Sequence, residues 1–251
     1  MTINPKYIFL ISILALFINS CNRNSNKVLE EPKYSNEDMY IKHFAYSLVY
    51  NEKNEQADWV AYCLKKEELK KNNKRKGNFR VDTLIITHTA NSNDYYKSGY
   101  DRGHLAPAAD MTWSEQAISE SFYYSNISPQ NISFNRGIWK KLENKVRELS
   151  IKYDCIYICT GPIYKGKIST IGDNKVAVPS HFYKALMIYN DTIHQSIAFI
   201  IPNKKNNKPL TDYAISIDSL ENVIGLDLYF SLPNSKEKVM ENSYNIRYWF
   251  Y

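Results

Sequence analysis

The chain has 251 residues, of which 44% are hydrophobic and 23% are charged. These fractions are ordinary for a globular protein and exclude a mostly disordered or collagen-like chain. Twenty-one tyrosines beside only eight glycines indicate a sheet-rich fold with polar-tipped aromatic residues on half-buried faces. The formal net charge of +6 is modest and by itself selects no partner.

The amino-terminal segment indicates export. Lys6 precedes the apolar run Tyr7–Ile18, which is too short to span a bilayer but has the length of a secretory signal. A small residue and then Cys21 follow, and this order resembles a bacterial lipoprotein signal that is cut before the cysteine. We therefore expect a signal peptide over 1–20, lipidation of Cys21 and a flexible tether over 21–38, with simple secretion as the alternative. The protein would then sit on the periplasmic or cell-surface side, tethered to the membrane only through its lipid, with release left open.

The remainder, 39–251, shows no repeat or low-complexity break and is predicted to be one domain. Segments rich in β-branched and aromatic residues predict strands at His43–Tyr50, Trp59–Leu64, Cys155–Thr160, Tyr183–Tyr189 and Thr192–Ile201, the last two forming a hairpin across Asn190-Asp191.

One amphipathic helix is predicted over 134–149. Its apolar residues share one face, and Ser133 is the expected N-cap. These residues are Ile138, Trp139, Leu142, Val146 and Leu149. Together with the strands, the helix predicts an α+β fold built on a mixed, largely antiparallel sheet.

Three cysteines follow Cys21, namely Cys63, Cys155 and Cys159. Cys155 and Cys159 would lie ~13 Å apart along one strand, beyond the ~7 Å that a disulfide allows between Cα atoms. We expect buried free thiols, and a bond between Cys63 and one of the other two is the alternative.

Positive charge is concentrated in 65–80, where eight Lys or Arg and two Glu give a net charge equal to that of the whole chain. Such a local patch fits a polyanion such as nucleic acid, although charge alone fits a solvated basic turn about as well.

The densest group of chemically active residues is DRGHLAPAAD, residues 101–110, with His104 at its centre. Gly103 allows close approach of the backbone beside this histidine. A lone histidine is more often structural than catalytic. The histidines at 43, 88, 181 and 194 sit in strand-like segments and are given that structural interpretation.

A second group lies just downstream. Asn126 and Asn135 flank a short polar segment, and the predicted helix carries Glu143 and Arg147 four residues apart. By spacing alone, these two are better explained as a surface ion pair. A straight helix would place Asn135 ~12 Å of axial rise before Glu143, which suits a hydrated Mg²⁺ held by one or two protein groups.

The segments DRGHLAPAAD and SNISPQNISFNRGIWKKLE (125–143) together resemble the sugar-non-specific DNA/RNA endonuclease family, which has a ββα-metal active site. Further segments stand in the family's order. They are WVAY (59–62), RKGNFRVD (75–82), TGPIY (160–164), VPSHFYK (178–184) and IAFIIPN (197–203).

The resemblance implies a role for each matching residue. His104 would be the general base, Asn135 the one protein ligand of Mg²⁺ (with Mn²⁺ as a substitute), and Glu143 the acid that orients water on the metal. The arginines around the scissile phosphate would be Arg75, Arg102 and Arg147, and Asn126 would support the site.

The implied reaction is Mg²⁺-dependent hydrolysis of DNA and RNA, without base or sugar specificity, to 5′-phosphate ends. Contacts to the phosphate backbone rather than to base edges or the 2′-OH would explain this indifference. A nucleic-acid-binding lipoprotein without catalysis and a sequence-specific or toxin nuclease remain alternatives. Homodimer formation is left open by the sequence.

Overall fold

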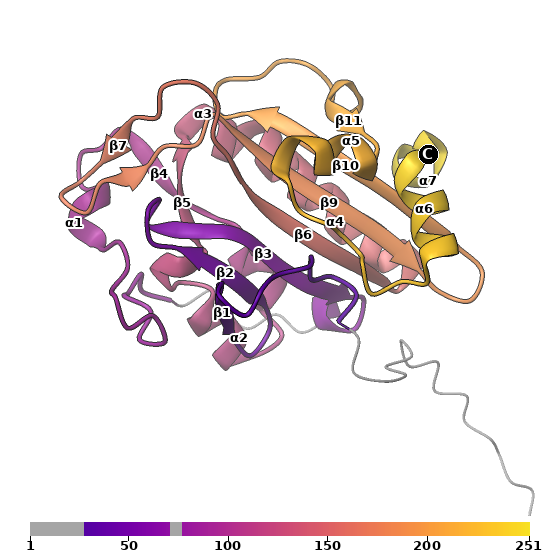
Figure 1. The fold of residues 1–251 in the computed structure, drawn as a ribbon, viewed down its shortest axis with the longest axis horizontal. Coiled ribbons are helices and arrows are strands. Elements are labelled where there is room, and N and C mark those ends of the chain that lie inside the picture. The colour runs from indigo at the N-terminus through magenta and orange to yellow at the C-terminus, as the bar shows by residue number, and fades with distance from the viewer. Residues whose placement is uncertain (1–27, 71–76) are drawn as a thin grey trace, which may run out of the picture.

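The computed structural model describes residues 28–70 and 77–251, and its main sheet has seven strands in the order β1-β2-β3-β6-β9-β10-β11 (Figure 1). Every ladder of this sheet is antiparallel. Its strands are β1 (Met39–Lys42), β2 (Ser47–Asn51), β3 (Gln56–Lys65), β6 (Cys155–Ile163), β9 (His181–Tyr189), β10 (His194–Pro202) and β11 (Ala214–Ile215). The predicted α+β class is confirmed.

The two faces of the sheet are covered by different parts of the chain. On one face, α4 (Lys140–Tyr153) buries Leu142, Val146 and Leu149 against the sheet, as the helical periodicity predicted. On the other face lie α5 (Ile217–Ile224) and α6 (Asn234–Asn242). Because apolar layers cover both faces, β3 and β9 are almost continuously buried.

A smaller two-stranded sheet joins β4 (Tyr100–His104) to β5 (Ile127–Asn131), and α3 (Ile132–Phe134) follows directly. The remaining elements connect these layers. They are α1 (Ser92–Tyr95), α2 (Glu115–Glu120), β7 (Thr170–Ile171) paired with β8 (Val176–Ala177), and α7 (Ile246–Phe250), with short 3₁₀ turns at Glu68–Lys70, Ala108–Met111, Tyr124–Asn126 and Leu210–Tyr213.

Four predictions about secondary structure and the amino-terminal tether need correction. The strand predicted over His43–Tyr50 is a turn, closed by the His43 N–H donating to the carbonyl of Tyr46, followed by β2. The helix N-cap is Asn131, whose side chain accepts from the N–H groups of Ser133 and Phe134, because the helix begins two residues earlier than predicted. His88 lies in a turn with φ of 80° and not in a strand.

The fourth correction concerns 28–38, which was expected to belong to the tether but contacts the domain. Glu31 is buried and accepts hydrogen bonds from Tyr40 (2.8 Å) and Ser47 (2.6 Å). The N–H of Lys33 donates to the carbonyl of Asp227. Paired polar groups and a stacked Tyr34–Tyr40 ring pair hold this segment against the first strands.

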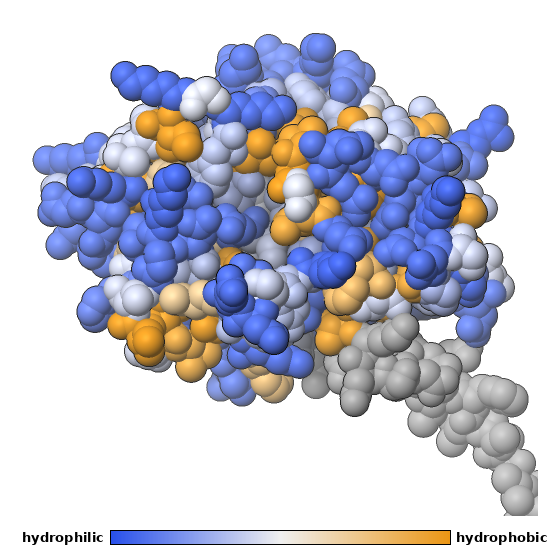
Figure 2. All heavy atoms as spheres, viewed as in Figure 1, coloured by the Kyte–Doolittle hydropathy of each residue, from blue (hydrophilic) through white to orange (hydrophobic). Residues whose placement is uncertain are grey.

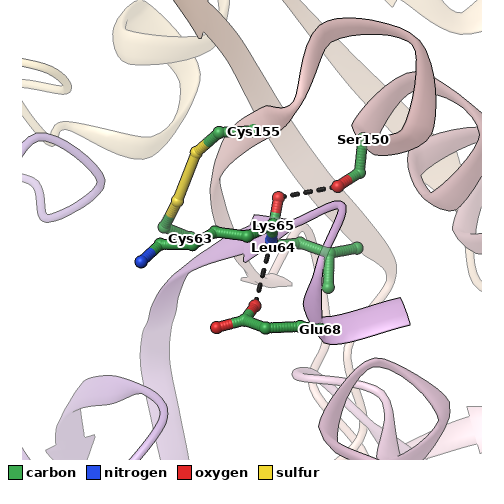
Figure 3. Close-up of a disulfide and its surroundings, with 6 residues drawn as sticks. All are labelled: Cys63, Leu64, Lys65, Glu68, Ser150 and Cys155. Carbon is green, nitrogen blue, oxygen red and sulfur yellow. Dashed lines mark hydrogen bonds between the residues drawn. A yellow bond between two sulfur atoms is a disulfide. The ribbon is translucent and has the colours of Figure 1, made fainter. Parts of the chain in front are cut away.

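The expectation that all three cysteines are free thiols is wrong for two of them. Cys63 on β3 and Cys155 at the start of β6 form a disulfide, with their Cα atoms 6.7 Å apart (Figure 3). In the register of these strands, Cys63 faces Tyr157 and Cys155 faces Lys65, so the two cysteines are diagonal neighbours. Cys159 is the buried free thiol, and burial raises the pKa of its sulfur to about 12.

Hydrophilic residues predominate on the face shown in Figure 2, where apolar residues form small separate groups. Among the described residues, no helix has the length and apolar character that crossing a membrane requires. Cys21 and the proposed signal peptide lie outside those residues.

Candidate active site

The candidate site is built on β4, β5 and the helix that follows them. The two strands pair antiparallel, with Arg102 opposite Pro129 and His104 opposite Ile127. The chain then enters α3 and continues into α4 through a wider π-helical turn, Asn135–Trp139. Gly137 in this turn leaves helical dihedral angles, so the straight-helix spacing predicted between Asn135 and Glu143 does not hold. The candidate residues that the structure describes lie on β4, in the 3₁₀ turn before β5, in the π-helical turn and on α4.

Close packing holds the strand that ends in His104. A Cβ on Gly103 would overlap the buried side chain of Gln130 on β5, so only glycine fits at this position. Beyond His104, Asn126 accepts a hydrogen bond from the N–H of Ala106 through Oδ1 (2.9 Å). Its Nδ2 donates to the carbonyls of Ala106 and Ser121, both at 2.9 Å. Asn126 is fully buried, and its three hydrogen bonds hold the backbone that follows His104.

Aromatic rings surround the His104 imidazole. Its centroid lies 5.0 Å from that of Phe122 in a perpendicular arrangement and 5.5 Å from that of Phe79. The guanidinium of Arg102 lies over the same Phe79 ring, 4.5 Å from its centroid. Phe79 therefore positions two predicted site residues at once. Sequence analysis did not single it out, although it stands within the family segment RKGNFRVD.

Asp101 joins the first end of the motif to the helix. Its Oδ2 accepts from Asn135 Nδ2 at 3.0 Å, and its carboxylate accepts two hydrogen bonds from Arg136, at 2.9 and 2.8 Å. Partial burial raises the pKa of Asp101, but these bonds outweigh it and leave the pKa below its ordinary value. Because the amide donates through Nδ2, its Oδ1 is left as the ligand atom for a cation. Asn135 is thus oriented as an oxygen ligand, which fits the predicted Mg²⁺.

Asp110 joins the other end of the motif to the helix. Its buried carboxylate lies 2.6 Å from Arg147 Nη1 and accepts a hydrogen bond from the Tyr62 hydroxyl at 2.9 Å. Burial raises the pKa of Asp110 and the charge of Arg147 opposes that rise. Arg147 therefore pairs with the buried Asp110, a partner that the spacing of the helix did not suggest.

A buried lysine lies beside Glu143. Lys184 on β9 is fully buried, and its Nζ is 4.9 Å from the centroid of the Trp139 ring. Burial lowers the pKa of Lys184 to about 8, while the negative charges of Glu143 and Asp110 act in the opposite direction. Two buried groups thus carry charges opposite to those of the helix residues. Asp110 is opposite in charge to Arg147 and Lys184 to Glu143, and sequence analysis assigned no role to either buried group.

The structure places most of the predicted site residues on consecutive elements of one ββα segment. His104 ends β4, Asn126 precedes β5, Asn135 lies in the π-helical turn, and Glu143 and Arg147 follow on α4. Arg102 is exposed and borders a surface hollow lined also by Tyr96 and Lys97. Arg75 lies outside the described residues, together with Lys71, Lys74 and Lys76 of the basic run.

A protein-family model for DNA/RNA non-specific endonucleases matches residues 24–235. The chain belongs to this family. The mitochondrial nuclease of Saccharomyces cerevisiae is 37% identical over 216 residues, and human endonuclease G is 35% identical over 197 residues. These matches cover 76% and 72% of this chain but only 65% and 66% of the relatives, so the chain spans slightly less than two thirds of their length.

A solved structure shows the same fold for this endonuclease family. In the crystal structure of the EndoG/EndoGI complex, one chain superposes on this protein with a TM-score of 0.75 at 32% identity. The superposition covers 81% of this chain and 90% of the solved one. The sequence resemblance to the family and the predicted ββα-metal class are both confirmed.

Proposed function

We propose that this protein is a Mg²⁺-dependent endonuclease that hydrolyses DNA and RNA, without base or sugar specificity, to 5′-phosphate ends. One observation carries the proposal. The segment 101–110 is bound to the helix at both ends, by Asp101 to Asn135 and by Asp110 to Arg147, with His104 between the two attachments. This arrangement ties a potential base, an oxygen ligand and an arginine into one connected unit, which favours catalysis by positioned groups.

Each residue of this unit would have a separate role in phosphodiester hydrolysis. A neutral imidazole at His104 accepts the proton of the attacking water. Arg102, exposed and stacked on Phe79, offers paired N–H donors to phosphate oxygens. Asn135, with Glu143 acting through water, would hold the divalent cation, and that cation would supply positive charge to the phosphate. A neutral ligand such as Asn leaves that charge undiminished.

The surface beside Arg102 suits a sugar-phosphate backbone. Lys97 and Tyr96 line the hollow next to this arginine, the Tyr96 side chain is 71% exposed, and Lys97 Nζ lies 5.1 Å from the centroid of its ring. A nucleic-acid base can stack on the exposed Tyr96 ring, and Lys97 and Arg102 can neutralise the phosphates on either side of it. Neither contact reads the edge of a base, so neither selects for sequence. This supports binding of DNA and RNA alike.

The decisive test is cleavage of plasmid DNA and of an unrelated RNA by the purified protein. Both should be degraded with Mg²⁺ and spared in EDTA. His104→Ala should lower kcat on the order of 10²–10⁴-fold while nucleic-acid binding persists. Fragments that ligate to an adaptor without prior kinase treatment would identify 5′-phosphate ends. Undiminished cleavage in chelator would refute the metal assignment, and equal activity of His104→Ala would refute the base.

We further propose that the protein is exported and anchored through a lipid on Cys21. The disulfide between Cys63 and Cys155 supports export, because such bonds persist in oxidising compartments and are rare in the cytosol. Cys21→Ser should move the protein from the membrane to the soluble fraction and abolish incorporation of labelled palmitate. An unchanged membrane fraction for Cys21→Ser would refute the anchor.

A further inference from the structure

A group of three carboxylates lies far along the chain from the candidate active site, where α5 meets α6. Asp218 and Glu221 stand one turn apart on α5, and Glu241 lies near the end of α6. One oxygen atom from each of the three side chains lies within 4.8 Å of the other two. The two helices pack on the face of the sheet opposite α4 (Figure 1), so this group is separated from His104 by the sheet.

Buried polar atoms point to a ligand in this group. Glu241 is only 8% exposed, and its Oε1 has no hydrogen-bond partner in the part of the chain that the structure describes. Tyr229, 1% exposed, likewise has a hydroxyl without a partner there, and the pKa of this hydroxyl is raised by burial and by the charges of Cys159, Glu241 and Glu221. A buried polar atom without a hydrogen-bond partner costs free energy. Glu241 Oε1 and the Tyr229 hydroxyl would therefore be expected to contact a bound ligand.

The local charge requires compensation. No Lys, Arg or His forms an ion pair with any of the three acids among the residues described. Burial and then the neighbouring carboxylates raise the pKa of Glu241 to about 8, and burial does most to raise that of Glu221 to about 7. A cation bound between the three carboxylates would supply the positive charge that no described residue supplies through an ion pair.

We propose that Asp218, Glu221 and Glu241 bind a Ca²⁺ ion that links α5 to α6. Ca²⁺ accepts carboxylate oxygens at ~2.4 Å, so two ligands on opposite sides of one ion lie ~4.8 Å apart, and all three oxygens fit around it. Mg²⁺ demands near-octahedral geometry at ~2.1 Å and gives up its waters reluctantly, so a set of three flexible carboxylates suits Ca²⁺ better. The absence of His and Cys from the group disfavours zinc. Glu221 Oε1 also accepts from the N–H of Leu228 at 2.6 Å, which orients its carboxylate.

This site is distinct from the proposed nuclease centre and does not depend on it. Glu241 lies beyond residues 24–235, the part of the chain that matches the endonuclease family. The ion would link α6 to α5, which packs on the sheet, and it need not contact a substrate. Its expected effect is therefore on stability and not on cleavage chemistry.

The test measures thermal unfolding of the metal-stripped full chain during titration with Ca²⁺ or Mg²⁺, together with terbium luminescence excited through tyrosine. Ca²⁺ should raise Tm at lower concentrations than Mg²⁺, and terbium should report a site that Ca²⁺ competes for. Glu241→Gln and Asp218→Asn should each weaken Ca²⁺ binding at least ~10-fold, as loss of a charged ligand from so small a set implies. Asn135→Ala should leave the Ca²⁺ effect on Tm intact, which separates this site from the nuclease centre.

The matched control is Glu237→Gln, which removes the same charge from α6 one turn earlier and outside the three ligands. It should retain Ca²⁺ binding. If Glu237→Gln and Glu241→Gln weaken the response equally, general screening of acidic charge explains it and the site is refuted. A wild-type Tm that does not respond to millimolar Ca²⁺ would likewise refute the proposal and leave protons as the compensating charge.

Discussion

Asp101 is predicted to set the metal affinity of the nuclease centre through Asn135. It accepts a hydrogen bond from Asn135 Nδ2 at 3.0 Å, which leaves the amide oxygen as the ligand atom for a cation. Replacing Asp101 with Ala frees that amide to rotate. Partners of metal ligands typically change affinity ~10–100-fold, which corresponds to about 1.4–2.7 kcal/mol. That range agrees with the ~1.5–3 kcal/mol of a hydrogen bond to a charged group.

The fold should tolerate this change, because the other partner of Asp101 is a surface residue. The Arg136 side chain is 70% exposed, and exposed ion pairs contribute little to stability. Asp101→Ala should therefore unfold near the wild-type temperature while requiring ~10–100-fold more Mg²⁺ for half-maximal cleavage. The matched control is Arg136→Ala, which removes the ion pair but keeps the bond to Asn135 and should behave like wild type.

The assay titrates cleavage of a labelled duplex against Mg²⁺ and, independently, follows Mn²⁺ binding by electron paramagnetic resonance. At saturating Mg²⁺ the kcat of Asp101→Ala should approach that of wild type. An unaltered Mg²⁺ requirement in Asp101→Ala would show that Asp101 does not orient the ligand. Equal impairment of Arg136→Ala would show that the ion pair, and not the bond to Asn135, is what the site needs.

Three further outcomes are expected. Replacing both Cys63 and Cys155 with Ser should lower the free energy of unfolding by about 2–5 kcal/mol in denaturant titrations, because the bond closes a loop across a separation of 92 residues; a smaller effect than 1 kcal/mol would contradict this. Burial raises the pKa of Asp82, but hydrogen bonds from His43 and Ser125 outweigh it and lower the pKa in the folded protein. The ionised carboxylate therefore stabilises the fold fully above its ordinary pKa of ~3.9. This stabilisation is lost as the pH falls through the lower pKa of the folded state. Asp82→Asn should therefore be less stable than wild type by roughly 2 kcal/mol at pH 6, with a difference that shrinks toward pH 3, whereas a constant difference would exclude linkage to this carboxylate. Gly103→Ala should lower stability by about 1–3 kcal/mol and also reduce activity, because Gln130 is buried and cannot yield; a fully active, stable variant would refute the close-packing argument.

Much of the local structure could be predicted from the sequence, because it depends on neighbouring residues. The apolar period of Ile138, Trp139 and Leu142 located the long helix, and runs rich in β-branched and aromatic residues located β3, β6, β9 and β10. Errors arose where local signals compete. Asn131 and Ser133 are both good caps, and the turn after His43 is as aromatic as the strand that follows it.

The central motif also identified the family, since DRGH and the downstream Asn and Glu lie within a short, ordered stretch of sequence. What the sequence alone could not supply was the set of partners that hold these groups. Asp101 and Asn135 are separated by 34 residues, Asp110 and Arg147 by 37, and Cys63 and Cys155 by 92. Nothing in the chemistry of either member of such a pair selects the other.

Tertiary structure decided these pairings because burial, and not sequence distance, controls the free energy of a polar group. Asp110 can remain buried only where Arg147 and Tyr62 reach it, and the register of β4 on β5 together with the path of the helix brings them there. The same principle explains why the buried acids of this protein have different partners. Those beside arginine hold the candidate active site together, whereas Glu241, buried among other carboxylates, requires a cation or a proton.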